Sequence, residues 1–156
     1  MPGDTIASPL RVLFVCTHNS SRSQMAEALL RARGGDRYAV YSAGTHPRQV
    51  HPLAIAAMRE LGIDLSTAAG YRAKSLREFE GQAFDLVVTV CDDAAEECPY
   101  FARARRQEHW SFPDPSAGTG TEEQRLAVFR QVRDAIARRI DEWLAANNGA
   151  ATAVGT

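Results

Sequence analysis

The chain has 156 residues, of which 45% are hydrophobic and 24% charged, and its formal net charge is −1. These values are typical of one globular domain with its own hydrophobic core, and they exclude a disordered chain, a membrane protein and a protein that coats nucleic acid. No apolar run reaches the roughly 18 residues of a membrane span, and the N-terminus lacks the charged and apolar regions of a secretory signal. We therefore expect a cytoplasmic monomer that contacts neither a membrane nor nucleic acid.

Strand-like and helix-like segments alternate along the chain. The four predicted strands are short apolar or β-branched runs, and they span 11–16, 38–44, 84–91 and 107–112. Two predicted helices with apolar residues at helical spacing span 23–33 and 51–61. A last helix begins at a capping-box pattern of Thr121 and Gln124 and continues to Ala146.

This alternation predicts a single α/β domain with a four-stranded parallel sheet and helices on both faces. The domain is expected to span 10–146, between a flexible N-terminal extension, 1–9, and a disordered tail, 147–156. In this architecture ligands bind at the carboxyl ends of the strands. Cys16 and Cys91 each end a predicted strand, so we expect the two thiols to share one site.

The segment "CTHNSSR", from Cys16 to Arg22, separates the first strand from the first helix. Its small residues allow successive backbone N–H groups to turn inward at a helix N-terminus, which makes a cradle for a tetrahedral oxyanion. Arg22 can donate two hydrogen bonds to that oxyanion, and the same positive field favours the nucleophilic thiolate of Cys16. The expected oxyanion-binding residues are Thr17, His18, Asn19, Ser20, Ser21, Arg22 and Ser23.

Two residues of this segment have further expected roles. Ser23 is placed to donate to the sulfur of Cys16, and Asn19 belongs to the residue types that tolerate a positive φ in a tight loop. As a bare pattern C-x5-R also arises by chance, and its position between a strand and a helix is what favours the catalytic interpretation.

Attack on an oxyanion centre needs an acid that protonates the departing oxygen. The stretch "FPDPS" places Asp114 between two prolines, in the loop after the fourth predicted strand. The alternative is an ordinary turn aspartate.

Three cysteines in a reducing compartment argue against structural disulfides. Cys91 and Cys98 are seven residues apart, which is not the close spacing of zinc ligands, so no metal is expected. If 92–97 were helical, the two thiols would lie about 10 Å apart, whereas a disulfide needs Cα atoms within about 7 Å. A disulfide between them therefore requires this short segment to unwind. The alternative for Cys98 is a buried apolar position.

Several motifs together resemble the thioredoxin-coupled arsenate reductases, which share the fold of the low-molecular-weight tyrosine phosphatases. The similar stretches are "VLFVCTHNSSRSQMAEALL", "YSAGTHP", "HPLAIAAMRELGIDLS", "DLVVTVCDDAAEECP" and "EHWSFPDPS". The resemblance covers about residues 10–146. The loop motif and the acid are shared with the phosphatases, whereas the pair Cys91 and Cys98 is specific to the reductases.

The resemblance implies a three-thiol mechanism. Cys16 attacks arsenate held by the loop and Arg22 while Asp114 protonates the leaving oxygen. Cys91 then attacks Cys16, which releases arsenite and leaves a 16–91 disulfide. Cys98 resolves it into a 91–98 disulfide, and reduced thioredoxin restores the thiols with electrons from NADPH through thioredoxin reductase. No cofactor is bound in this scheme.

The chain departs from its relatives at three positions. His18 stands where they usually have glycine, and Ser21 where they often have another cysteine. Some relatives hold a potassium ion, and Tyr71 stands in place of an aspartate of that site, which argues against a bound cation here. The positions that match the remaining ligands of that ion are Asn19, Glu27 and Ser42.

Two other functions compete with arsenate reduction. The first is a phosphatase of the low-molecular-weight type, in which Cys91 and Cys98 only protect Cys16 from oxidation. The second is a redox sensor or anion-binding module with no turnover.

Overall fold

The structure is a computed structural model that describes residues 8–92 and 103–155, with side chains to Asn147. Most of the predicted N-terminal extension and all of the stretch around Cys98 lie outside the described residues. Within the described part, no helix is long and apolar enough to cross a membrane.

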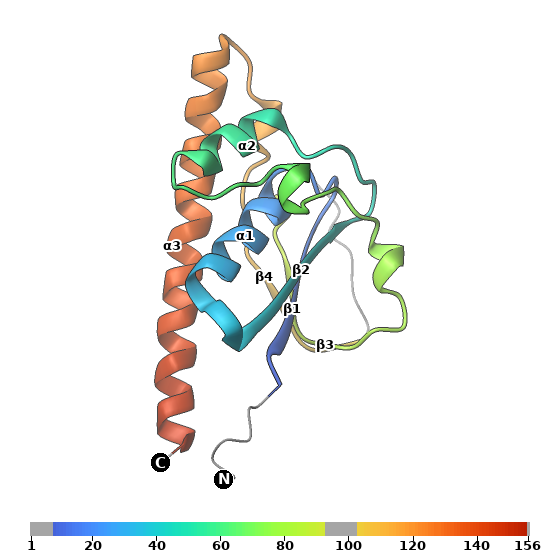
Figure 1. The fold of residues 1–156 in the computed structure, drawn as a ribbon, viewed down its shortest axis with the longest axis vertical. Coiled ribbons are helices and arrows are strands. Elements are labelled where there is room, and N and C mark those ends of the chain that lie inside the picture. Colours follow the sequence, from blue (N-terminus) through green and yellow to red (C-terminus); the bar gives the residue numbers. More distant parts are fainter. Residues whose placement is uncertain (1–7, 93–102, 156) are drawn as a thin grey trace.

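Four parallel strands form one sheet in the order β2-β1-β3-β4. Their bounds are β1 Leu10–Cys16, β2 Tyr38–Gly44, β3 Phe84–Thr89 and β4 Ala104–His109. The sheet lies to the right of α3 in Figure 1, and β1 and β3 are its central strands. The prediction of a single α/β domain with four parallel strands is confirmed.

Two strand ends differ from the prediction. The third strand ends at Thr89 rather than at Cys91. The fourth lies at 104–109 rather than 107–112, because an edge strand has one open side and therefore carries polar residues that an apolar pattern does not detect. Trp110 and Phe112, which suggested the later bounds, lie beyond the strand and are buried in the core.

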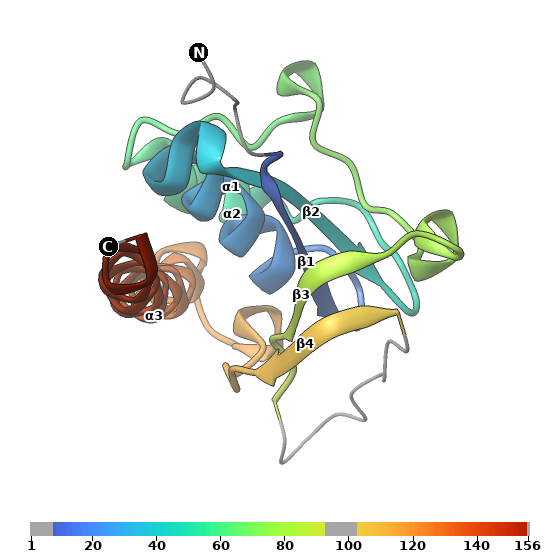
Figure 2. The ribbon, with the colours of Figure 1, turned by 90° about the horizontal axis from the view of Figure 1, so that it is seen from below.

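Three α-helices pack on one face of the sheet, as Figure 2 shows. They are α1 Arg22–Gly34, α2 Pro52–Arg59 and α3 Glu122–Gly155. On the opposite face the described residues supply a smaller apolar cluster, to which the 3-10 helix η4, Leu76–Phe79, contributes Phe79. Within residues 8–92 and 103–155, the helix on this second face is the 3-10 helix η4.

The start of α3 follows the predicted capping box. The N–H of Thr121 donates to Oε1 of Gln124 at 2.9 Å, and the N–H of Gln124 donates to Oγ1 of Thr121 at 3.1 Å. The helix continues to Gly155, past Ala146, where the sequence predicted a disordered tail over 147–156. Alanine supplies only three of the ten tail residues, and the others are weaker helix formers, so the composition of the tail does not explain this extension.

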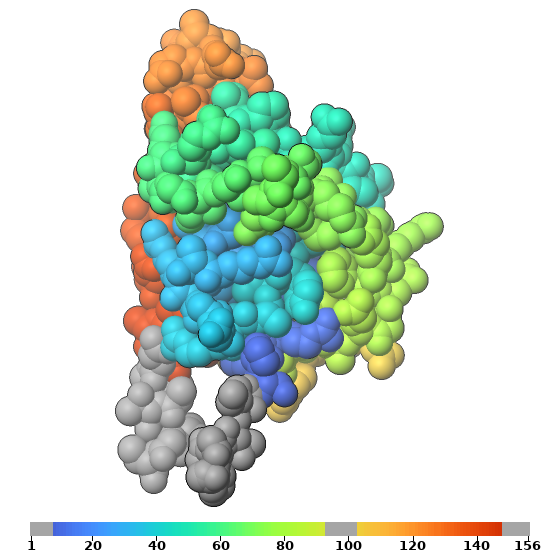
Figure 3. Space-filling view, in the orientation of Figure 1, coloured from blue at the N-terminus to red at the C-terminus, as the bar shows by residue number. Residues whose placement is uncertain are grey.

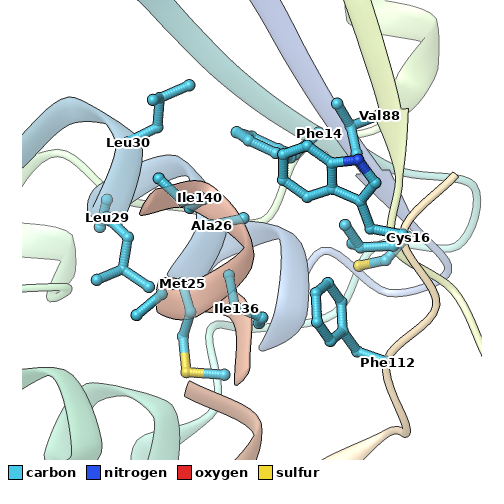
Figure 4. Packing of buried hydrophobic residues seen from close by; sticks show 14 of the residues in the cluster. Phe14, Cys16, Met25, Ala26, Leu29, Leu30, Val88, Phe112, Ile136 and Ile140 are labelled. Atoms are coloured by element: carbon cyan, nitrogen blue, oxygen red, sulfur yellow. The ribbon is translucent and has the colours of Figure 1, made fainter. Parts of the chain in front are cut away.

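The main core lies between the sheet and the helices. Figure 4 shows Phe14 and Val88 of the sheet facing Ile136 and Ile140 of α3, with Cys16 and Phe112 at the end of the strands. The long segment between β2 and β3 wraps over the end of the domain where α1 begins (Figure 3). The carboxyl ends of β1 and β3 therefore meet buried side chains from several distant segments.

Candidate active site

Cys16 is the last residue of β1, and Arg22 is the first residue of α1. The intervening loop, residues 17–21, thus lies at the carboxyl edge of the sheet and at a helix N-terminus, where backbone N–H groups have no partner within the helix. Both Cys16 and Arg22 are buried, at 1% and 2% exposure. This is the strand–loop–helix arrangement that an oxyanion cradle needs.

The sulfur of Cys16 has two neighbouring donors. The N–H of Asn19 donates to it at 3.2 Å, and the hydroxyl of Ser23 lies 2.8 Å away. The Ser23 oxygen accepts a hydrogen bond from Nδ2 of Asn19 at 2.8 Å, so the Ser23 proton is free to point at the sulfur. These two contacts fix the position of the sulfur at the start of the loop.

Asn19 is completely buried and adopts φ 49°, the left-handed conformation expected for this position. Nε2 of Gln24 donates to its carbonyl oxygen and to Oδ1 at 3.0 and 2.9 Å, and the N–H of Lys74 donates to Oδ1 at 2.7 Å. The Gln24 amide also reaches the carbonyl of Arg72 at 2.8 Å. The sequence did not indicate Gln24 or Lys74, because Gln24 follows the polar Arg22 and Ser23 and no local pattern distinguishes it.

A second segment, residues 45–51, runs along the loop and holds its carbonyl groups. The N–H groups of His46, Arg48 and His51 donate to the carbonyls of Thr17, His18 and Ser20, and the three distances are 2.7, 2.9 and 2.9 Å in that order. Nδ1 of the half-buried His18 lies 3.0 Å from the carbonyl of His46, which only accepts, so this nitrogen carries the proton. The loop carbonyls, which would repel an anion, are thus engaged by the protein.

Gly44 permits this close approach. It pairs with Cys16 across the sheet. A Cβ at this position would lie 2.7 Å from the carbonyl oxygen of Thr17 and 2.8 Å from the nitrogen of Asn19, which are both backbone atoms. No other residue type fits there without displacing the loop.

Arg22 and Asp114 face each other across the site. Nη1 of Arg22 donates to the carbonyl of Phe112 at 3.2 Å, and Nη2 lies 3.8 Å from Oδ2 of Asp114. The other carboxylate oxygen, Oδ1, accepts from the N–H and the hydroxyl of Ser116 at 2.9 and 2.7 Å. Asp114 is therefore both the turn aspartate of the alternative interpretation and a partly exposed carboxylate beside Arg22.

Cys91 lies two residues beyond the end of β3, the strand that pairs with β1. The N–H of Val90 donates to the carbonyl of Val15 at 2.9 Å, so the chain continues alongside β1 beyond the end of β3. Cys91 is fully buried in the same apolar cluster as Cys16. The predicted sharing of one site by these two thiols agrees with this placement, whereas Cys98 lies outside the described residues.

Ser21 is the loop residue best suited to an additional ligand contact. Its side chain is buried, and its Oγ has no hydrogen-bond partner within the part of the chain that the structure describes. A buried hydroxyl normally has a partner, so this orphaned group fits a site that binds a polar oxyanion. Residues 8–92 and 103–155 contain no cluster of three His, Cys, Asp or Glu side chains able to hold a metal ion.

His51 links the 45–51 segment to α2. Its Nδ1 accepts from the N–H of Leu53 at 3.0 Å, which caps the helix, and its ring lies 4.7 Å from that of Phe129. Burial lowers the pKa of His51 below its ordinary value of 6.5; the charge of Arg125 adds to this effect, and Asp114 opposes it. The neutral form is therefore the one that the fold prefers.

Comparisons with known proteins identify a family and several similar chains. The profile of the low molecular weight phosphotyrosine protein phosphatase family matches residues 11–151. An arsenate reductase of Bacillus subtilis is 44% identical over 132 residues, which cover 85% of this chain and 93% of the relative.

Two solved structures are similar over most of the chain. One, an arsenate reductase in the phosphate binding state, is 34% identical with a TM-score of 0.73 and covers 87% of this chain and 97% of its own. The other, a thioredoxin-dependent arsenate reductase of Corynebacterium glutamicum, is 28% identical with a TM-score of 0.64 and covers 92% of this chain and 65% of its own.

The contact of Gly44 with the loop predicts the effect of Gly44→Ala. The added methyl group must displace backbone, so we expect a Tm lower by about 5 °C or more and slower alkylation of Cys16 by iodoacetamide, measured by peptide mass spectrometry. Gly118→Ala is the matched control, because its Cβ would make only ordinary contacts of 3.5 and 3.8 Å. Equal Tm values and alkylation rates for the two variants would contradict the close contact of Gly44 with the loop backbone.

The environment of His51 predicts a pH-dependent stability. Because its pKa is lower in the folded than in the unfolded chain, its contribution is complete above about pH 6.5 and declines as the pH falls through that value. Asparagine caps helices without titrating, so the Tm of His51→Asn should fall less steeply between pH 7.5 and 5.5, by about 2 °C over the range. If the Tm of the two proteins falls equally with pH, another titrating group causes the pH dependence of stability.

Proposed function

Since the chain belongs to the low molecular weight phosphotyrosine protein phosphatase family and is similar to arsenate reductases over most of its length, we propose that it reduces arsenate to arsenite. The proposed reaction uses a relay of Cys16, Cys91 and Cys98 that thioredoxin regenerates. The observation that carries it is the burial of Cys16 and Cys91 at adjoining strand ends, beside an oxyanion loop. A phosphatase needs only the first of these thiols.

In the first step the Cys16 thiolate attacks the arsenic atom. Backbone N–H groups of the loop and the guanidinium of Arg22 stabilise the negative oxygens. Asp114, beside Arg22, gives a proton to the departing oxygen, which leaves as water. An arsenic–sulfur bond replaces an arsenic–oxygen bond, and arsenic is still pentavalent.

Reduction occurs in the second step. The Cys91 thiolate attacks the sulfur of Cys16, a disulfide forms, and the electron pair of the broken arsenic–sulfur bond passes to arsenic. Arsenite, which is trivalent, leaves. The two electrons thus come from the two thiols, and the shared apolar surroundings of Cys16 and Cys91 exclude water from the exchange.

Regeneration returns the protein to the thiol state. Cys98 attacks Cys91, which frees Cys16 and forms a 91–98 disulfide. Reduced thioredoxin then reduces that disulfide, with NADPH as the ultimate donor through thioredoxin reductase, and no cofactor is bound to this chain. The thioredoxin-dependent relative from Corynebacterium glutamicum supports this choice of reductant.

A phosphomonoesterase activity is the second candidate, because the matching family profile is that of a phosphatase and a cradle for arsenate also fits phosphate. We expect NADPH consumption with arsenate, thioredoxin and thioredoxin reductase to exceed hydrolysis of an aryl phosphate at least tenfold. Replacing thioredoxin by glutaredoxin and glutathione should abolish the turnover. Hydrolysis of the aryl phosphate at least tenfold faster than NADPH consumption with arsenate would identify a phosphatase.

The relay predicts where each cysteine variant stops. Cys98→Ser should release one arsenite per protein and accumulate a 16–91 disulfide, because its resolving thiol is missing. Cys16→Ser should release none, since it lacks the nucleophile. Mass mapping of disulfides after arsenate addition measures both, and repeated turnover of Cys98→Ser with thioredoxin would exclude the relay.

A further inference from the structure

A chain of hydrogen bonds leads from the reactive sulfur to a buried carboxylate. Nδ2 of Asn19 donates both to Ser23, which adjoins the sulfur of Cys16, and to Oγ of Ser42 at 2.9 Å. Ser42 in turn donates to Oε1 of Glu27, and Ser42 and Glu27 are only 0% and 3% exposed. A carboxylate accepts and an amide NH2 donates, so Glu27 orients the hydroxyl of Ser42 and Asn19 orients the hydroxyl of Ser23.

A buried carboxylate needs a compensating positive charge. Two side chains of the protein supply it. Nη2 of Arg31 lies 2.7 Å from Oε2 of Glu27, and Nζ of Lys74, the only lysine of the sequence, lies 3.8 Å from Oε1. Nζ of Lys74 is held in place by a hydrogen bond to the carbonyl of Arg72 at 2.8 Å.

Tyr71 completes this arrangement. The guanidinium of Arg31 lies 5.3 Å from the centroid of the Tyr71 ring, within the range of a cation–π contact. A tyrosine ring stabilises a cationic side chain above it but offers no carboxylate to a metal ion. The residue that departs from the potassium-binding relatives is thus the one that holds Arg31 at Glu27.

These donors do not fit a potassium ion. Both oxygens of Glu27 already face a protein cation, and a third positive charge beside the ammonium of Lys74 would be repelled. We propose that Lys74 and Arg31 form a built-in cation site, which replaces a monovalent metal ion and keeps the network from Glu27 to Cys16 in its catalytic orientation. Lys74 is a positioning residue, since it acts on the sulfur only through the residues between them.

The surroundings of Lys74 act on its ammonium group in both directions, with a net lowering of its pKa. Burial lowers the pKa of Lys74, and the nearby Glu27 carboxylate opposes that shift; Arg72 and Arg31 lower the pKa further, while Glu78 raises it. The ammonium group of a lysine is a compact charge at the end of a flexible side chain, so among the side chains it most closely resembles a bound monovalent ion.

The wild-type protein gives the first test. Its Tm and the rate of Cys16 alkylation are measured in potassium, sodium and choline chloride at equal ionic strength. We expect Tm values within about 1 °C and equal alkylation rates, because the site already holds its cations. A Tm several degrees higher in potassium would overturn the proposal, whatever the reaction of the enzyme.

Substitution of Lys74 gives the second test. Lys74→Met should lower the Tm by about 3–8 °C and slow Cys16 alkylation several-fold, because Glu27 loses one of its two cations. The matched control is Arg77→Met, which removes the same charge from an exposed position of the same segment and should change neither quantity. The double variant Lys74→Met/Tyr71→Asp, which restores the aspartate of the relatives, should regain Tm and alkylation rate in potassium but not in choline.

The built-in cation site rests on the proposed function at one point only, which is that the network from Glu27 to Cys16 supports arsenate turnover. Arsenate turnover of Lys74→Met should fall together with its alkylation rate. If the wild type shows no arsenate turnover but the alkylation and Tm results hold, the proposed function fails and the built-in cation stands. If Lys74→Met matches Arg77→Met in both quantities, the built-in cation fails irrespective of turnover.

Discussion

The buried amide of Asn19 is the contact on which the site depends. Its side chain donates to Ser23 and Ser42 and accepts from Gln24 and Lys74, so its hydrogen-bonding capacity is used entirely inside the protein. Its own N–H is thereby aimed at the sulfur of Cys16, and its positive φ turns the loop around that sulfur. Replacing Asn19 by a residue without an amide would leave several of its buried polar partners without a hydrogen bond, each at a cost of about 1–3 kcal/mol.

The rest of the fold serves to bring those partners together. The parallel sheet places the ends of β1 and β3 side by side, and Cys16 and Cys91 belong to the same buried cluster at that edge. Gly44 lets the loop lie against β2, and the 45–51 segment occupies the loop carbonyls. Contacts within the protein thus hold the shape of the cradle, and a prearranged set of donors is the condition for strong electrostatic stabilisation of a transition state.

A second consequence concerns charge. The buried carboxylate of Glu27 lies at the end of the Asn19 network, and its compensation by Arg31 and Lys74 comes from the protein itself. Arg31 is one helical turn from Glu27, whereas Lys74 reaches it from the far end of a long connection. The network therefore ties the reactive thiol to the packing of a distant segment.

The sequence by itself determined the parallel α/β domain, the first two strands and the position of the reactive loop, because apolar periodicity and turn residues are local signals. It also indicated Asn19, Ser23 and Asp114, whose chemistry is readable beside Cys16 and Arg22. It placed the polar edge strand β4 about three residues too late, and it did not show that the three α-helices of the described residues pack on one face. Only the tertiary structure decided that Gln24, Gly44 and Lys74 belong to the site, since hydrogen bonds between residues up to 55 positions apart leave no local pattern.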